Sequence, residues 1–167
     1  MKRIIYLACF LGIISALAGG ILAYVNDVTY EKINEIAIAS EKANLIKLYP
    51  NGAFEEVTFN DDSGLIKKVF KVDNGAYIYK IEVYGYKDYI SFLVAIDDGK
   101  IVGYTVISVN DTPGYGMRVA DDEYVNSITG TSIDADVPLL SGATISSTSV
   151  VNGIEAAIKL HQSLGGN

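Results

Sequence analysis

The segment at residues 76–109, AYIYKIEVYGYKDYISFLVAIDDGKIVGYTVISV, decides the fold. From residue 76 to residue 84, the odd-numbered positions are aromatic or β-branched and the charges fall on even-numbered positions, which predicts a strand with one buried face. Residues 89–96 and 101–109 read as two further strands. The intervening Asp98-Gly99 is a hairpin signal, because glycine accepts the positive φ of a type I′ turn. With a strand at residues 67–72, these segments predict a small antiparallel sheet.

Helices are expected on both sides of this sheet. Residues 30–49 carry apolar side chains near helical spacing and stop at Pro50-Asn51-Gly52, and residues 148–164 resume the same period. Ser146 and Ser147 are the expected N-caps of the second helix. Residues 118–138 look polar and irregular. The sequence therefore predicts an α+β fold, in which an apolar N-terminal helix precedes a small antiparallel sheet with flanking helices.

The apolar N-terminal helix is predicted from residues 4–25. This segment contains no charge and, as a helix, is long enough to cross a hydrocarbon core of about 30 Å. Lys2 and Arg3 precede the segment and acidic residues follow it, so the positive-inside rule predicts a single-pass anchor in the cell (inner) membrane, with a cytoplasmic N-terminus and an exported domain. A cleaved signal peptide is the alternative, because Ala16-Leu17-Ala18 resembles a cleavage site. The apolar run continues through Val25, which favours retention.

The predicted organisation has three parts: a cytoplasmic start and membrane anchor at residues 1–26, a linker helix and connection at residues 27–65, and a globular domain at residues 66–167. The net charge of −7 argues against nucleic-acid binding. The only cysteine is Cys9 and the only histidine is His161, so no metal site is expected. His161 is expected at the surface, as a cap residue near the end of the last helix. No catalytic constellation of nucleophile, base and acid is visible.

Two short motifs are candidates for a site. Ser141-Gly142-Ala143-Thr144 leads into the last helix, where free backbone N–H groups and the helix dipole favour a phosphate-sized anion. From the residues alone, an ordinary helix cap is the competing interpretation. The second motif, Asp111-Thr112-Pro113-Gly114-Tyr115-Gly116, interrupts the strand pattern and predicts a loop.

The chain resembles the FMN-binding domain family, which includes the G subunit of Rnf-type ion-translocating oxidoreductases and the C subunit of the sodium-translocating NADH:quinone reductase. The resemblance is carried by the anchor running into Asn26-Asp27-Val28-Thr29, by the Asp111–Gly116 loop and by the Ser141–Thr144 signature, in that order along the chain. It implies that a flavin transferase joins FMN to Thr144 through a phosphoester. The further cofactor-binding residues that it implies are Ser141, Gly142, Ala143, Ser146, Ser147, Asp111, Thr112 and Gly114.

The function implied by the resemblance is electron transfer as a redox subunit of a membrane-bound ion-translocating oxidoreductase complex, with the other subunits as partners. Two alternatives remain: a stand-alone anchored flavoprotein reductase, and a non-redox anchored binding module. The sequence departs from the family pattern at Pro138, six positions before Thr144, where many members carry Asp; the nearest acidic residue here is Asp136. This departure bears on recognition by the transferase.

Overall fold

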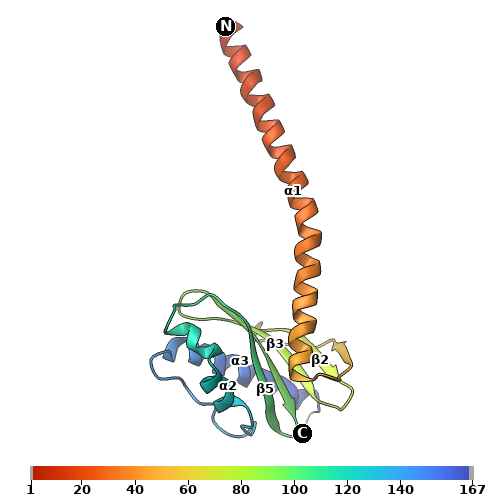
Figure 1. Ribbon diagram of the computed structural model, residues 1–167, viewed down its shortest axis with the longest axis vertical. Helices are drawn as coiled ribbons and strands as arrows, with labels where there is room; N and C mark the ends of the chain where they lie inside the picture. Colours follow the sequence, from red (N-terminus) through yellow and green to blue (C-terminus); the bar gives the residue numbers. More distant parts are fainter. Residues whose placement is uncertain (1, 166–167) are drawn as a thin grey trace. The chain divides into compact units, whose positions relative to one another are not determined.

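The computed structural model describes residues 2–165, apart from the side chains at positions 31 and 34. The chain divides into two compact units, residues 1–42 and residues 43–167. The element order is α1, five strands, a 3₁₀ turn η1, α2 and α3 (Figure 1). The predicted α+β fold is confirmed.

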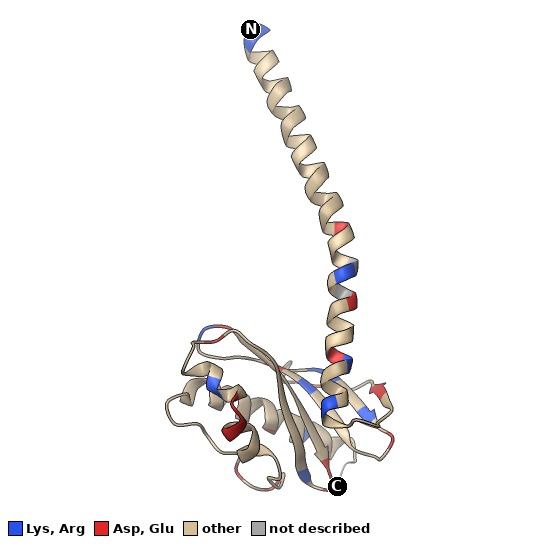
Figure 2. Ribbon diagram, in the orientation of Figure 1, with Lys and Arg blue, Asp and Glu red and all other residues tan. Residues whose placement is uncertain are grey.

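Helix α1 (Lys2–Leu48) runs without a break through the predicted anchor and the predicted helix at residues 30–49, so these are one helix. Part of it is long and apolar enough to cross a membrane, with a mean hydropathy of 2.3 over its most apolar window and none of that window buried. Beyond the basic residues at the N-terminus, charges return only in the second half of the helix (Figure 2). These properties fit the predicted membrane anchor.

The second unit is built on a five-stranded antiparallel meander in the order β1-β2-β3-β4-β5. Its strands are β1 (Phe54–Val57), β2 (Ile66–Val72), β3 (Tyr77–Tyr84), β4 (Tyr89–Asp97) and β5 (Lys100–Val109). The predictions of β2, β3, β4 and β5 are confirmed to within one residue at each end. Strand β1 was not predicted, because it is a four-residue edge strand with two exposed glutamates and no apolar alternation.

Both faces of the sheet are covered, which explains why β4 is almost continuously apolar. One face carries Tyr79, Ile81 and Phe92 against α3 (Thr144–Ser163) and α2 (Asp122–Ile128). The other face is covered by a smaller cluster that includes Leu45 of α1 and Ile78 of β3. A strand buried on both sides has no polar face to alternate with.

The hairpin between β4 and β5 turns as expected at Asp98-Gly99. Asp98 has φ of 47° and Gly99 has φ of 67°, the two positive values that a type I′ turn requires. The prediction that residues 118–138 are wholly irregular is wrong, because η1 (Gly116–Ala120) and α2 lie largely within them. The spacing of Tyr124 and Ile128, both buried, is the helical signal in that segment.

Helix α3 begins earlier than predicted. Its first residue is Thr144 and its N-cap is Ala143, so Ser146 and Ser147 lie inside the first turn rather than capping it. The expected surface position of His161 is also wrong: its side chain is 2% exposed, and its Nδ1 lies 2.9 Å from the hydroxyl of Tyr79. The last turn of α3 packs on the sheet, which the helical period alone did not show.

Candidate functional site

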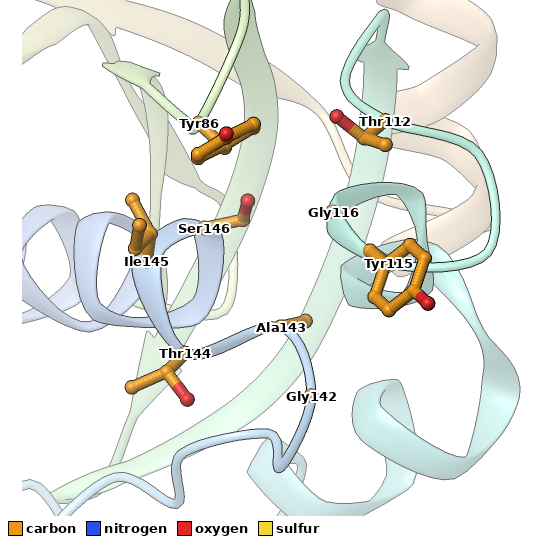
Figure 3. A pocket seen from close by; sticks show the side chains of 9 residues that line it. All are labelled: Tyr86, Thr112, Tyr115, Gly116, Gly142, Ala143, Thr144, Ile145 and Ser146. Carbon is orange, nitrogen blue, oxygen red and sulfur yellow. The ribbon is translucent and has the colours of Figure 1, made fainter.

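A cleft of about 480 Å³ opens at the N-terminus of α3. Its lining residues are Tyr86, Thr112, Tyr115, Gly116, Gly142, Ala143, Thr144, Ile145 and Ser146. Figure 3 shows the first turn of α3 on one side and Thr112, Tyr115 and Gly116 across the opening, with Tyr86 at one end and Gly142 at the other. Its volume lies within the range of about 300–1,000 Å³ that is usual for small-ligand sites.

The start of α3 offers backbone donors to this cleft. The first hydrogen bond of the helix joins the N–H of Ser147 to the carbonyl of Ala143 at 2.9 Å, so the N–H groups of residues 144–146 lie ahead of the helical ladder. Ala143 makes no side-chain cap hydrogen bond. This helix end therefore presents donors and a positive dipole end without a capping side chain, an arrangement that suits an anion.

The loop before the helix is fixed by a turn at Gly142. This residue has φ of 82°, in the left-handed region that glycine adopts without strain. The carbonyl of Ser141 accepts a hydrogen bond of 3.0 Å from Nη1 of Arg118. A Cβ on residue 142 would stand 3.4 Å from the same nitrogen. The guanidinium group thus ties the loop to η1 and brings a positive charge close to the signature motif.

Asp111 joins three segments around the cleft. Its carboxylate accepts hydrogen bonds from the hydroxyl of Ser146 at 2.6 Å and from the backbone N–H groups of Tyr86 at 2.9 Å, Lys87 at 3.1 Å and Thr112 at 2.7 Å. The side chain is 3% exposed. One buried carboxylate therefore links the β3–β4 turn, the loop after β5 and the first turn of α3.

Two glycines make room for this carboxylate. A Cβ on Gly85 would collide with Oδ2 of Asp111, and a Cβ on Gly116 would collide with the carboxylate carbon and both oxygens. Neither glycine has a positive φ, so the space that they leave is what matters. The side chain is enclosed by backbone on both sides.

The ionised form of Asp111 is favoured in this setting. Burial by itself raises the pKa of the carboxyl, but the hydrogen bonds from Ser146 and from the N–H groups of Tyr86, Thr112 and Lys87 outweigh it and hold the pKa below its ordinary value. A carboxylate that accepts several hydrogen bonds is stabilised as the anion. The site therefore contains a buried negative charge that is satisfied by the protein.

The predicted site residues divide into two groups. Thr112, Gly142, Ala143, Thr144 and Ser146 line the cleft, and Thr144 is exposed. Asp111, Gly114, Ser141 and Ser147 do not line it. Ser147 is buried, and its hydroxyl accepts a hydrogen bond from the N–H of Leu140 at 3.1 Å. Asp111, Ser141 and Ser147 hold the segments around the cleft through hydrogen bonds.

The cleft also contains residues that the motifs did not single out. Tyr86, Tyr115, Gly116 and Ile145 line it, and Arg118 fixes its signature loop. Tyr86 belongs to the turn after β3 and is 58 positions from Thr144 in the sequence. No local pattern relates such distant positions, so only the folded chain shows that they share a site.

Comparison with known families agrees with this geometry. The family profile described as the FMN-binding domain matches residues 85–159, a range that begins just before Tyr86 and includes every residue of the cleft. The chain is similar to the FMN-binding domain family over this range. The predicted resemblance is thereby confirmed.

The names of the curated relatives describe them as G subunits of ion-translocating oxidoreductase complexes. The G subunit of a Na(+)-translocating ferredoxin:NAD(+) oxidoreductase complex from Acetobacterium woodii is 26% identical, over 98% of this chain and 94% of its own. The G subunit of an ion-translocating oxidoreductase complex from Methanosarcina acetivorans is 28% identical, over 87% and 88%.

A third relative matches over a shorter region. The G subunit of a proton-translocating ferredoxin:NAD(+) oxidoreductase complex from Clostridium ljungdahlii is 30% identical over 96 residues. The match covers 50% of this chain and 52% of the relative, so the chain spans about half the length of this relative.

Proposed function

We propose that this protein is a membrane-anchored electron-transfer subunit of an ion-translocating oxidoreductase complex, and that it carries FMN joined to Thr144 by a phosphoester. The observation that carries the proposal is the position of Thr144. It is the exposed first residue of α3, and it lines a cleft inside the region that matches the FMN-binding domain. FMN supplies one- and two-electron redox chemistry when it is bound.

The surroundings of Thr144 suit attachment by a flavin transferase with FAD as the donor. In that reaction, the Thr144 oxygen forms a bond to the phosphorus of the FMN half, the bond to AMP breaks and the hydroxyl proton is lost. The hydroxyl-bearing side chain is exposed, and it follows Gly142 and Ala143, which present little bulk to an approaching enzyme. Ser146 is buried and bonded to Asp111, so it is a poorer acceptor for the same transfer.

The chain also provides groups that suit the resulting phosphodiester. The N–H groups at the start of α3 point along the helix axis toward its N-terminal side, where the dipole favours an anion. Arg118, bonded to the carbonyl of Ser141, adds a positive charge to the same loop. The lining of the cleft beyond the loop includes Tyr86, Tyr115 and Ile145, which suit a flat, largely apolar ring.

The partners and location follow from the apolar helix and from the relatives. Helix α1 holds a segment long enough to span a bilayer, preceded by Lys2 and Arg3. We therefore place the N-terminus in the cytoplasm and the FMN-binding domain on the other side of the cell membrane. The redox partners are other subunits of the complex, as the names of the relatives suggest.

The mass of the intact chain tests the attachment. The full chain is coexpressed with a flavin transferase in an exporting host and compared with Thr144→Ala. We expect a gain equal to FMN less one water in the native chain and no gain in Thr144→Ala. Thr148→Ala is the matched control, because Thr148 is exposed on the same helix but does not line the cleft, and it should retain the gain.

The outcomes separate the alternatives. An unmodified native chain, beside a control substrate that the same transferase modifies, would contradict the attachment and favour the binding module. A modified chain that purifies from native membranes without other subunits would favour the stand-alone reductase. A modified chain that copurifies with other membrane redox subunits supports the proposed role.

A further inference from the structure

The β3–β4 turn contributes an aromatic side chain to the cleft that neither sequence motif contains. Tyr86 is 64% exposed and lines the cleft. Figure 3 shows its ring at the end of the cleft away from Gly142, beside Ile145 and Ser146. A single exposed tyrosine needs no explanation by itself. The backbone around Tyr86, however, is held by several hydrogen bonds.

Three backbone N–H groups of this turn donate hydrogen bonds, and the hydroxyl of Tyr84 donates to the carbonyl of Lys87 at 2.8 Å. The N–H of Tyr86 donates to Oδ2 of Asp111, and the N–H of Lys87 donates to Oδ1 of the same carboxylate. The N–H of Gly85 donates to the carbonyl of Asp88 at 2.9 Å. Gly85 also lacks the Cβ that would push the carboxylate away. The turn is therefore built to hold the backbone of residue 86 against Asp111.

The same carboxylate oxygen also holds the helix that bears Thr144. Oδ2 of Asp111 accepts the hydroxyl of Ser146 at 2.6 Å as well as the N–H of Tyr86. Thr144 and Ser146 belong to one helical turn. The backbone of the attachment residue and the backbone that bears the aromatic side chain are thus connected through one buried group.

Tyr115 across the cleft is connected to α3 less directly. Its N–H donates to the carbonyl of Thr112 at 3.2 Å, and its own carbonyl accepts the N–H of Arg118 at 3.0 Å. Arg118 in turn donates to the carbonyl of Ser141, which precedes the helix. The backbone of Tyr86 instead shares one carboxylate oxygen with Ser146, inside the first turn of α3, so of the two tyrosines it has the shorter connection to Thr144.

We propose that Tyr86 is the side chain against which the isoalloxazine ring stacks when FMN is bound in this cleft. The inference rests on the proposed function for the identity of the ligand. Tyr86 supplies a flat face, which binds a planar ring through dispersion and burial of apolar surface. Asp111 is a positioning residue, which sets the distance between the tether and this face.

Flavin fluorescence distinguishes stacking on Tyr86 from mere proximity. A phenol in contact with an excited flavin quenches its emission by transient electron donation, whereas a phenylalanine ring stacks without doing so. In the full chain carrying covalent FMN, we expect Tyr86→Phe to raise the emission yield several-fold. Tyr89→Phe is the matched control, because this residue lies on the same hairpin with 55% exposure but does not line the cleft. Its emission should equal that of the parent.

A binding measurement tests the same inference without the covalent bond. Free FMN is titrated into the full-chain Thr144→Ala variant in detergent. Adding Tyr86→Ala should weaken binding by about tenfold, since stacking of a planar base on an aromatic side chain contributes on that order. Adding Tyr86→Phe instead should leave the affinity nearly unchanged.

The outcomes separate the stacking on Tyr86 from the attachment at Thr144. Covalent FMN with unchanged emission in Tyr86→Phe, or a rise in Tyr115→Phe alone, would overturn the assignment of Tyr86 and leave the proposed function standing. If the native chain shows no mass gain, but free FMN binds with quenched fluorescence in a manner that depends on Tyr86, the attachment is contradicted and the stacking is supported. Absence of both attachment and binding would overturn both.

Discussion

The hydroxyl of Ser146 lies 2.6 Å from Oδ2 of Asp111, and both side chains are buried. Their positions are 35 residues apart in the sequence, one after β5 and the other in the first turn of α3. The bond connects the two motifs that the sequence singled out. Ser146 lines the cleft and Asp111 does not, so the bond fixes one wall of the cleft from behind.

Removal of the Ser146 hydroxyl tests the strength of this connection. Ser146→Ala leaves a buried carboxylate with one donor fewer, and hydrogen bonds to charged groups contribute roughly 1.5–3 kcal/mol. We expect the free energy of unfolding to fall by about that amount in urea, followed by tyrosine fluorescence because the chain has no tryptophan. Thr148→Ala, on the exposed side of the same helix, should change it little. Equal effects of the two substitutions would contradict the role of the bond.

The acid stability of the domain depends on the same carboxylate. Because the pKa of Asp111 is lower in the folded chain than its ordinary value of about 3.9, its ionisation stabilises the fold above that pH, and the contribution is lost as the pH falls through the folded-state pKa. Asp111→Asn should be less stable than the parent at neutral pH, with a difference that shrinks below about pH 4. A difference that stays constant from pH 7 to pH 2 would show that the charge of Asp111 is not the cause.

The close approach of α3 to the sheet depends on Gly153. A Cβ there would stand 2.8 Å from Cγ2 of Ile81 and 3.0 Å from Phe92 and Val83, all of them buried. Helix propensity alone predicts that Gly→Ala stabilises a helix by about 1 kcal/mol, but overpacking of a core costs typically about 1–3 kcal/mol. We expect Gly153→Ala to lower the midpoint of urea unfolding. The exposed neighbour Asn152 is the control, since Asn152→Ala should raise it slightly.

The residue at position 138 should influence the rate of flavin attachment. By the resemblance described above, Pro138 stands where an Asp is expected; it is half-buried, while the nearby Asp136 is exposed. If the transferase reads an acidic side chain at that distance from Thr144, Pro138→Asp will increase the initial rate of the mass gain. Asp136→Asn should decrease it if Asp136 serves in its place. Unchanged rates in both variants would show that the enzyme does not read this segment.

Retention of the N-terminal segment has a direct test. The anchor predicts that the mature chain keeps residues 4–25, stays in the membrane after washing at alkaline pH, and is cut by protease only from the extracytoplasmic side. A cleaved signal peptide predicts instead a soluble chain that begins near Gly19. The mass of the protein isolated from membranes decides between them.

Much of the fold could be read from local patterns. The alternation in residues 76–84 and the Asp98-Gly99 turn predicted β3 and the β4–β5 hairpin, because a strand face and a type I′ turn leave short-range signatures. Strand β1 was not predicted, because four residues with two exposed glutamates carry no such signature. The start of α3 at Thr144 was not predicted, because Ser146 and Ser147 resemble N-caps in the sequence but are buried by tertiary packing.

The sequence by itself determined the apolar anchor segment, the antiparallel hairpins and the two motifs, because each depends on residues that are near neighbours in the chain. The tertiary structure decided that Asp111 is buried between two glycines, that Tyr86 joins Thr144 in one cleft and that His161 packs against Tyr79. These relationships join positions up to 82 residues apart. They depend on which faces pack together and on where buried polar groups find partners, and neither is encoded in local periodicity.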